Sequence, residues 1–294
     1  MIAKTGLVME STVARMSQFH PEVHKDSLSE KVTLVAGGSN GIGASLLELC
    51  CENGAYVIIG DIDATRGEQV AGKCTQQWPV HSEPTGPPKP PRVSFRKTDV
   101  TDYRSVLDLF DSTFRTYDRI DRVVIPAGST ETRESWFDHS LNLAQVRKAP
   151  SVKEIDVNLL GALYVTRVAS VYLRHNRGPG VDRSILLFSC AGIKQTPVVP
   201  IYQVAKHGAE DTMRSLHANF NSPYRHSIRI NTICPWMAQT GNAFSRTVEE
   251  RWAKKGRPIS TADDVAKVAA GVICDDSLHG VSMYVEGTRL GDRK

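Results

Sequence analysis

The sequence has little of what marks several large classes of protein. No apolar run among its 294 residues approaches the roughly 20 residues that span a bilayer. Lysine and arginine exceed aspartate and glutamate by only 36 to 32, and the basic residues are scattered. We therefore expect no nucleic acid partner and no membrane span. The chain also lacks internal repeats and long linkers, and its length suits one large α/β domain or two small ones.

Metal-binding and targeting signals are similarly scarce. The six cysteines do not have the spacing of metal ligands, and four lie beside or within apolar runs, which predicts reduced, buried thiols in a cytoplasmic protein. Glu10 interrupts any signal-peptide core, and three acidic residues by position 26 argue against a mitochondrial presequence. His20 and His24 are spaced like two zinc ligands, but Pro21 disfavours a helix there and no third ligand follows. We expect no metal site.

Short apolar segments alternate with helix-like segments along the chain. Seven strands are predicted, at 32–35, 56–60, 93–96, 122–125, 185–188, 228–233 and 282–286. Helices are predicted at 64–77, from near Asp102, over 151–175 and from Thr261, where Asp264 completes a capping box. Residues 129–150 are polar and irregular, and residues 1–29 form an N-terminal extension. The alternation predicts a single-domain α/β fold, a Rossmann-type doubly wound parallel seven-stranded sheet.

A glycine-rich turn joins the first predicted strand to a helix. Residues 36–43 read AGGSNGIG, and such a turn lets the backbone approach a pyrophosphate, which the free N–H groups of the helix then bind. The second strand ends in Asp61, whose carboxylate can accept hydrogen bonds from both ribose hydroxyls and would repel a 2′-phosphate. Neither Ser39 nor Ile62 supplies a cation for that phosphate, so the sequence favours NAD over NADP.

The residues with the clearest chemistry follow the fifth predicted strand. Ser189 ends that strand, and Tyr202 and Lys206 come later on a segment whose apolar residues recur with a helical period. The tyrosine and the lysine are therefore neighbours on one helix face. A phenol titrates near pH 10, and an ammonium group beside it favours the phenolate and lowers that pKa. The same pair also occurs on ordinary solvated helices, so it does not establish a site by itself.

Two further polar residues have more than one interpretation. Asp99, after the third strand, either accepts a hydrogen bond from the adenine amino group or caps the helix that begins near Asp102. Asn158 lies inside the predicted helix 151–175, which is apolar almost all round and so is expected to make contacts on more than one face.

In order and spacing, these motifs resemble the classical short-chain dehydrogenase/reductase family over about residues 31–290. The matching residues are Gly37, Gly41, Gly43, Asp99, Asn158, Ser189, Tyr202, Lys206, Pro235 and Thr240. The resemblance implies that Tyr202 is the catalytic acid/base and that Lys206 bonds the nicotinamide ribose and lowers the tyrosine pKa. It also implies that Ser189 orients the substrate oxygen and that Asn158 holds a water for proton relay. The implied reaction is hydride transfer from a carbinol carbon to NAD, with the hydroxyl proton leaving to Tyr202.

The resemblance also implies a cofactor site, an assembly and a domain assignment. Residues 30–294 are expected to form an NAD-binding catalytic domain, and the helices around Asn158 and Tyr202 are expected to pair with symmetry mates in a homodimer or homotetramer. The predicted cofactor-binding residues are Gly37, Ser39, Asn40, Gly41, Ile42, Gly43, Asp61, Ile62, Asp99, Val100, Ala127, Gly128, Tyr202, Lys206, Pro235, Trp236, Ala238 and Thr240.

The chain departs from the usual family pattern in three places. Ala36 replaces a threonine before the first glycine, Ile125 and Pro126 replace two asparagines, and Trp236 replaces the glycine after Pro235. The side-chain hydrogen bonds that brace the central strands are therefore expected to be missing or replaced. The sequence is most similar to the branch near prostaglandin-type dehydrogenases and fungal enzymes that tailor polyketides and terpenoids.

The substrate wall implied by the resemblance is mainly apolar. Lys194 is its main charged residue, Arg246 is expected to face solvent, and about half of the wall is expected to pack into the core. The pattern predicts a bulky, largely uncharged secondary alcohol or the matching ketone, such as a terpenoid or polyketide intermediate. Ketone reduction in vivo, a non-redox relative and an NAD-binding scaffold are the alternatives. The wall comprises Ile193, Pro197, Val198, Val199, Trp236, Met237, Ala238 and Phe244.

Overall fold

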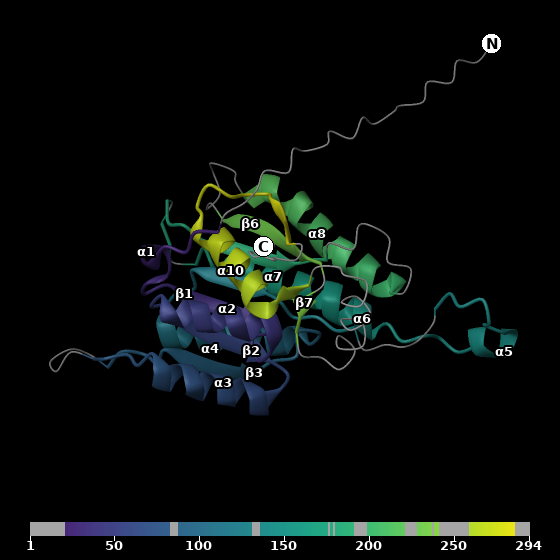
Figure 1. Cartoon of the computed structure of the whole chain (residues 1–294), viewed down its shortest axis with the longest axis horizontal. Coiled ribbons are helices and arrows are strands. Elements are labelled where there is room, and N and C mark those ends of the chain that lie inside the picture. The colour runs from purple at the N-terminus through teal and green to yellow at the C-terminus, as the bar shows by residue number, and fades with distance from the viewer. Residues whose placement is uncertain are drawn as a thin grey trace, which may run out of the picture.

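Seven parallel strands form the central sheet of this protein (Figure 1). The structure is a computed structural model that describes residues 21–82, 88–130, 136–175, 177–178, 180–190, 199–220, 228–236, 238–240 and 259–285. The strands are β1 (Val32–Ala36), β2 (Tyr56–Asp61), β3 (Val93–Lys97), β4 (Arg122–Ile125), β5 (Ser184–Phe188), β6 (Arg229–Pro235) and β9 (Ser282–Val285). Their order is β3-β2-β1-β4-β5-β6-β9, so the chain winds outward from β1 and then back through β4. The predicted single-domain Rossmann-type fold is confirmed, and its switch point lies between β1 and β4.

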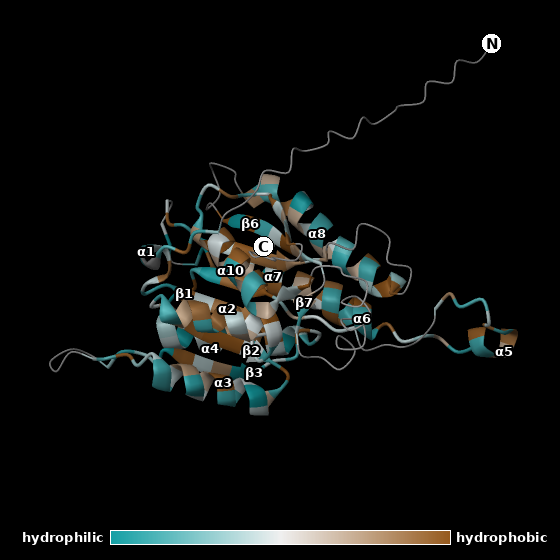
Figure 2. Ribbon diagram, in the orientation of Figure 1, coloured by the Kyte–Doolittle hydropathy of each residue, from teal (hydrophilic) through white to brown (hydrophobic). Residues whose placement is uncertain are grey.

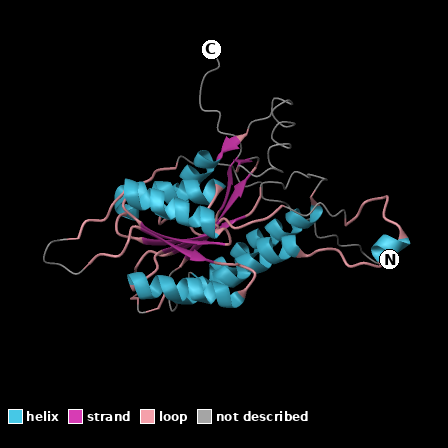
Figure 3. Ribbon diagram, turned by 90° about the horizontal axis from the view of Figure 1, so that it is seen from below, coloured by secondary structure: helices cyan, strands magenta, loops and turns pink. Residues whose placement is uncertain are grey.

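Helices cover both faces of the sheet (Figure 3). One layer contains α2 (Gly41–Glu52), α3 (Ala64–Gln77) and α10 (Ala262–Cys274). The other contains α4 (Tyr103–Tyr117), α7 (Gly161–Tyr172) and α8 (Pro200–Phe220). Shorter elements are α1 (Lys25–Leu28), α5 (Leu143–Val146), α6 (Lys153–Ile155) and a small pair of β7 (Ala238–Gln239) with β8 (Ser260–Thr261).

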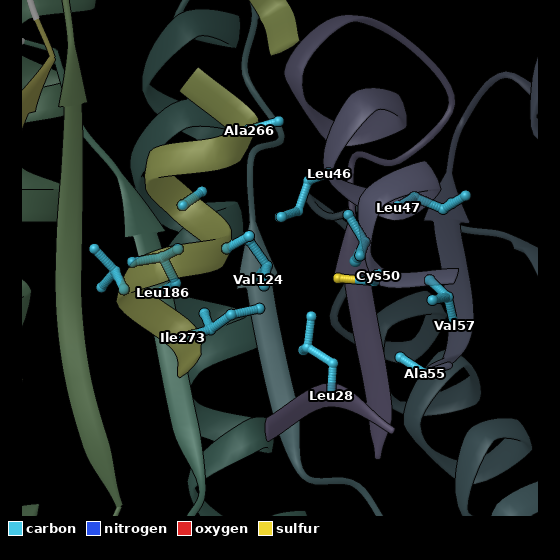
Figure 4. Close-up of a cluster of buried hydrophobic side chains, with 14 of the residues drawn as sticks. Leu28, Leu46, Leu47, Cys50, Ala55, Val57, Val124, Leu186, Ala266 and Ile273 are labelled. Atoms are coloured by element: carbon cyan, nitrogen blue, oxygen red, sulfur yellow. The ribbon is translucent and has the colours of Figure 1, made fainter. Parts of the chain in front are cut away.

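The two layers of core follow from the alternation of side chains along each strand. In β4, Val124 faces the α2 and α10 layer while its neighbour Val123 faces the α4 and α7 layer, and both are fully buried. Figure 4 shows the first of these cores, where Leu186 and Cys50 pack around Val124. Figure 2 shows the contrast between core and surface: the central strands are mostly hydrophobic, and the outer surface of α8 is mostly hydrophilic.

The packed body begins before the first strand. Leu28 of α1 is fully buried in the same core as Leu46 and Ala55 (Figure 4). The residues just before position 30, which the sequence places in the extension, therefore contribute to the core. A single apolar residue in a short segment has no periodicity that predicts this packing.

The predicted continuous helix over 151–175 is wrong in its middle. The chain forms α6, then a π-helical turn, η1 (Asp156–Leu160), and then α7. Such turns insert an extra residue into the hydrogen-bond ladder and are frequent at functional sites. Here the π turn contains Asn158. The apolar pattern of the segment contains no signal for this local change of period.

The remaining predictions concern small features. Asn142 caps α5 within the segment predicted to be irregular, and the predicted capping box of Thr261 and Asp264 is confirmed at the start of α10. All six cysteines are free, and all are buried except the half-buried Cys190. Within the described ranges, every helix is too short or too polar to cross a membrane.

Candidate active site

The turn between β1 and α2 is built from backbone contacts that only glycine permits. Gly37 has a φ of +101°, and a Cβ added to it would lie 2.5 Å from the backbone nitrogen of Ala127. A Cβ added to Gly43 would lie 2.1 Å from the carbonyl oxygen of Gly37. The Gly37 N–H donates to the carbonyl of Gly60 over 2.7 Å, which fastens the turn to β2. The turn therefore sits at the carboxyl edge of the sheet.

The amino end of α2 opens onto this turn. Asn40 occupies the N-cap position with extended backbone, but its side chain makes no capping hydrogen bond. The first N–H groups of a helix need a partner, and together with the helix dipole they favour an anion. Gly41, at the first helical position, has a φ of +53° and lies against Thr240, whose Cβ would be 3.1 Å from an added Cβ. The turn and the uncapped helix fit the pyrophosphate of a dinucleotide.

Asp61 is held in place beside the turn by two backbone amides. Its two carboxylate oxygens accept hydrogen bonds from the N–H of Ser39 and from the N–H of Asp63, each over 3.0 Å. Ile62 is 63% exposed next to it. The carboxylate therefore has a fixed position at the end of β2, where the sequence predicts contact with the adenosine ribose.

Asp99 closes the turn that leads into α4. Its Oδ1 accepts from the backbone N–H and the hydroxyl of Thr101, over 2.9 and 2.7 Å. The N-cap of α4 is Asp102, which accepts from the backbone N–H of Arg104. The capping interpretation of Asp99 is therefore wrong, because the N-cap is Asp102, three residues later. The contact of Asp99 with adenine stays a prediction. Val100 is buried, and its Cγ2 would lie 2.7 Å from a Cβ on Gly161.

The end of β4 connects the glycine turn to the predicted catalytic residues. The N–H of Ala127 donates to the carbonyl of Ala36 over 3.0 Å, so a backbone bond links β1 and β4 where family members usually have polar side chains. A Cβ on Gly128 would lie 2.8 Å from the Oδ1 of Asn158 and 3.1 Å from the Nζ of Lys206. Gly128 is thus the point where the cofactor turn, η1 and α8 meet.

Asn158 uses its side chain to clamp this junction. Its Nδ2 donates to the carbonyls of Ser129 and Glu154, over 2.7 and 2.9 Å, and its Oδ1 accepts from the N–H of Ser129. Both amide hydrogens are therefore engaged, and the residue is 1% exposed. The implied water relay stays a prediction. Both side-chain N–H groups are already engaged, so a water would have to be bound by another group of this residue.

Lys206 is a buried amine next to Tyr202. Its Nζ donates to the carbonyl of Phe188 over 3.1 Å and lies 5.9 Å from the centroid of the Tyr202 ring. Burial lowers the pKa of Lys206 to about 8. Among the described residues, no carboxylate forms an ion pair with this amine.

The lowering of the Tyr202 pKa that the sequence implies for this amine stays a prediction, because the groups around the tyrosine act in the opposite direction. Burial raises the pKa of Tyr202 well above its ordinary value, and the nearby Cys190 and Glu154 raise it further. The Nζ of Lys206 lies over the ring and bonds Phe188, so it does not offset the cost of burying a phenolate. Tyr202 is partly buried, and these surroundings act against its ionisation.

Ser189 lies at the same junction but directs its hydroxyl to the backbone. Its Oγ donates to the carbonyl of Lys206 over 2.7 Å, and its N–H donates to the carbonyl of Ile233 over 2.8 Å. The residue is 4% exposed. The hydroxyl ties β5 to α8, and its role in orienting a substrate stays a prediction.

The remaining predicted residues are only partly described. Pro235 ends β6, the N–H of the half-buried Trp236 donates to the carbonyl of Val285, and Ala238 pairs β7 with β8. Val199 is partly buried at the start of α8. The predicted wall residues Ile193, Lys194, Pro197, Val198, Met237, Phe244 and Arg246 lie outside the described residues.

One residue of the site has no counterpart in the sequence prediction. Glu154 is 4% exposed on α6, its carbonyl accepts from Asn158, and its charge contributes to the raised pKa of Tyr202. The sequence signal that could have identified Glu154 as a site residue is its acidic side chain within a largely apolar helical stretch.

Comparison with known proteins agrees with this geometry. The sequence profile described as short chain dehydrogenase matches residues 31–251. The chain therefore belongs to the short-chain dehydrogenase family of oxidoreductases, whose fold binds a nicotinamide cofactor.

Similar proteins come from fungi, plants and animals. The chain is 29% identical to the short-chain dehydrogenase/reductase ascJ of Acremonium egyptiacum, over 88% of this chain and 79% of that protein. It is 27% identical to (+)-borneol dehydrogenase 1 of Salvia officinalis, over 88% and 94%. It is 30% identical to L-fucose dehydrogenase of Bos taurus, over 88% and 87%. The crystal structure of gox2181 has the same fold, with a TM-score of 0.72 at 23% identity over 89% of this chain and 97% of that chain.

Proposed function

We propose that this chain is an NAD-dependent short-chain alcohol dehydrogenase acting on a bulky, largely apolar secondary alcohol in terpenoid or polyketide biosynthesis. The observation that carries the proposal is the junction after β4, where Ala127 lies against the glycine turn and the next residue, Gly128, lies against Asn158 and Lys206. The six free cysteines support a cytoplasmic location.

The roles of the side chains follow from their positions. Tyr202 exchanges a proton with the substrate oxygen, and Ser189, whose hydroxyl bonds the carbonyl of Lys206 one helical turn after Tyr202, orients that oxygen. When bound, oxidised nicotinamide supplies the hydride acceptor and a positive charge. Lys206 and the uncapped end of α2 are the groups of this chain that hold the ribose and the pyrophosphate. Asn158 keeps β4 and α6 in register, so that the proton-transfer group and the cofactor turn stay aligned.

Ketone reduction is the second candidate, and the state of Tyr202 favours it. The surroundings of Tyr202 disfavour the phenolate that alcohol oxidation uses as a base, and they leave the phenol that gives its proton in ketone reduction. Measuring kcat/KM against pH in both directions separates the two candidates. Oxidation with a rate that rises with pH and exceeds reduction near neutrality supports the dehydrogenase, whereas faster reduction at neutral pH supports the reductase.

Asp61 is expected to select NAD. Its fixed carboxylate repels a 2′-phosphate, so kcat/KM is expected to be at least tenfold higher with NAD than with NADP, or about 1.4 kcal/mol. Asp61→Ala is expected to reduce this ratio of kcat/KM with NAD to kcat/KM with NADP. Asp63→Ala is the control, because the Asp63 side chain, two residues away, caps α3 and pairs with Arg66. Equal use of both cofactors by the unchanged protein would contradict the assignment.

The substrate prediction is best tested with alcohols of contrasting polarity. Two similar proteins bear the names of borneol and L-fucose, and these compounds make a suitable pair of probes. The partly buried Val199 and Trp236 support an apolar contact, so we expect kcat/KM to be at least tenfold higher for borneol than for L-fucose, or about 1.4 kcal/mol. A preference for the sugar or for a short hydroxy acid would overturn the substrate class but leave the role of Tyr202 intact.

The assembly is proposed to be a homodimer or homotetramer through α7 and α8. Three apolar side chains on these helices stay exposed in the single chain: Leu163 at 39%, Val171 at 46% and Val204 at 61%. Val204→Glu is expected to shift light scattering at micromolar concentration toward monomer, since a charge at an apolar interface is costly. Val146→Glu on α5 is the matched control and is expected to leave the assembly unchanged. A monomeric unchanged protein would contradict the proposal.

A further inference from the structure

The amino ends of the central strands carry an unusual concentration of arginine. Arg122 of β4, Ser184 of β5 and Arg229 of β6 are in register, and Arg183 immediately precedes β5. Because the strands are parallel, these ends lie at the opposite edge of the sheet from the glycine turn and Tyr202. A site here would therefore be separate from the candidate active site.

One of the two carboxylates at this edge is fully occupied by two arginines. Asp182 accepts from the Nη2 of Arg122 and, over 2.7 Å, from the Nε of Arg229. Burial opposes ionisation of Asp182, but bonds from these two guanidinium groups outweigh it, and the pKa of the carboxyl lies below its ordinary value. In this half of the cluster both guanidinium groups bond the carboxylate, and the Nε of Arg122 is left without a partner among the described residues.

The other carboxylate is also occupied. Asp121 is fully buried and accepts from the Nη2 of Arg177 over 2.8 Å, from the Nε of Arg119 over 3.2 Å and from the N–H of Val32 over 2.8 Å. Four arginines thus pair with two carboxylates at this edge. Arg183 is the arginine that neither carboxylate pairs with within the described part of the chain.

Arg183 is buried with most of its donors unused. It is 0% exposed, and its Nη2 donates to the carbonyl of Gly178. Its Nε and Nη1, and the Nη1 of Arg177, have no hydrogen-bond partner among the residues that the structure describes. Burial and the charge of Arg177 both lower the pKa of Arg183, so the two guanidinium groups lie close enough to repel. The carboxylates of Asp121 and Asp182 oppose this effect, but neither bonds Arg183, so three buried donor atoms lack a partner in a cluster where arginines outnumber carboxylates.

We propose that Arg177 and Arg183 form a binding site for a tetrahedral oxyanion of the phosphate class. An unpaired buried donor next to a like charge is costly, and an oxyanion removes both penalties because it accepts several hydrogen bonds and carries negative charge. Guanidinium groups match phosphate oxygens in geometry and bind them through paired N–H groups. A water molecule would satisfy the donors but would not compensate the charge.

The site is tested by thermal unfolding and calorimetry in the presence of saturating nicotinamide cofactor, which occupies the pyrophosphate-binding turn. Inorganic phosphate is compared with chloride at equal ionic strength. We expect a single phosphate site and a rise in Tm of about 5 °C or more when phosphate is about a hundredfold above its Kd. Phosphate also stabilises proteins without binding to a specific site, so the rise in Tm of the unchanged protein is compared with that of variants of the site.

Arg183→Leu and Arg177→Gln are expected to lose the phosphate-dependent rise in Tm. Arg119→Gln removes a half-exposed arginine that pairs with the other carboxylate oxygen of Asp121, and it is expected to keep the rise. If Arg183→Leu does not fold, Arg177→Gln decides, since its side chain is partly exposed. An equal rise in chloride would overturn the assignment to an oxyanion. An unchanged phosphate response in Arg177→Gln, or no response in the unchanged protein, would overturn the site.

Discussion

Replacing Tyr202 by phenylalanine is expected to lower turnover by about a hundredfold or more, the usual effect of losing an acid/base group. Cofactor affinity is expected to stay near normal, because the hydroxyl forms no hydrogen bond to the glycine turn within the described part of the chain. Steady-state kinetics and titration of cofactor fluorescence measure the two quantities separately.

Tyr103→Phe is the matched control for this experiment. It removes a hydroxyl at the start of α4 that accepts a hydrogen bond from the exposed Arg167 of α7, and it is expected to leave turnover unchanged. A Tyr202→Phe enzyme that keeps a tenth of the normal activity would remove Tyr202 from its role as acid/base.

Replacing Lys206 by methionine is expected to make the protein more stable and nearly inactive. A pKa of about 8, against 10.5 for an ordinary lysine, means that the charged amine opposes folding by roughly 3 kcal/mol at pH 7. The variant loses the hydrogen bond to the carbonyl of Phe188, worth about 1 kcal/mol, so the net gain is expected to be about 2 kcal/mol. Turnover is expected to fall by at least about a hundredfold, because the group at the junction of cofactor and Tyr202 is lost.

The pH dependence of stability provides an independent check on Lys206. Between the folded pKa of about 8 and the unfolded 10.5, the unfolded chain binds more protons than the folded one. The free energy of unfolding of the unchanged protein therefore gains a contribution that rises with pH over that window, and Lys206→Met lacks it. Denaturant unfolding at several pH values measures the difference. A variant that is less stable than the unchanged protein at pH 7 would contradict the buried charged amine.

Much of the architecture could be predicted because it depends on local patterns. The seven apolar segments became the seven strands, and Thr261 with Asp264 capped a helix as expected, since capping depends only on residues three apart. The glycine turn was also predictable, because close backbone approach requires glycine whatever the surrounding fold. These features need no knowledge of what packs against them.

The features that the sequence did not predict are set by tertiary contacts. The π turn at Asn158 accompanies hydrogen bonds from its side chain to Ser129, about thirty residues away along the chain. The raised pKa of Tyr202 depends on Glu154 and on burial. Asp99 lies four residues before α4 and Asp102 is its N-cap, but the two aspartates look alike in the sequence. Only their hydrogen-bond partners in the structure show which one caps the helix.

Isotope transfer tests the central claim, that this chain moves a hydride between a secondary alcohol and NAD, most directly. The assembled enzyme is incubated with NAD and with secondary alcohols that carry deuterium on the carbinol carbon, and the reduced nicotinamide is analysed by mass spectrometry. The proposed function predicts reduced cofactor that contains the deuterium with at least one bulky apolar alcohol, and its loss in Tyr202→Phe. Absence of deuterium from the cofactor with every alcohol tested, alongside absence of ketone reduction by the deuterated reduced cofactor, would contradict it.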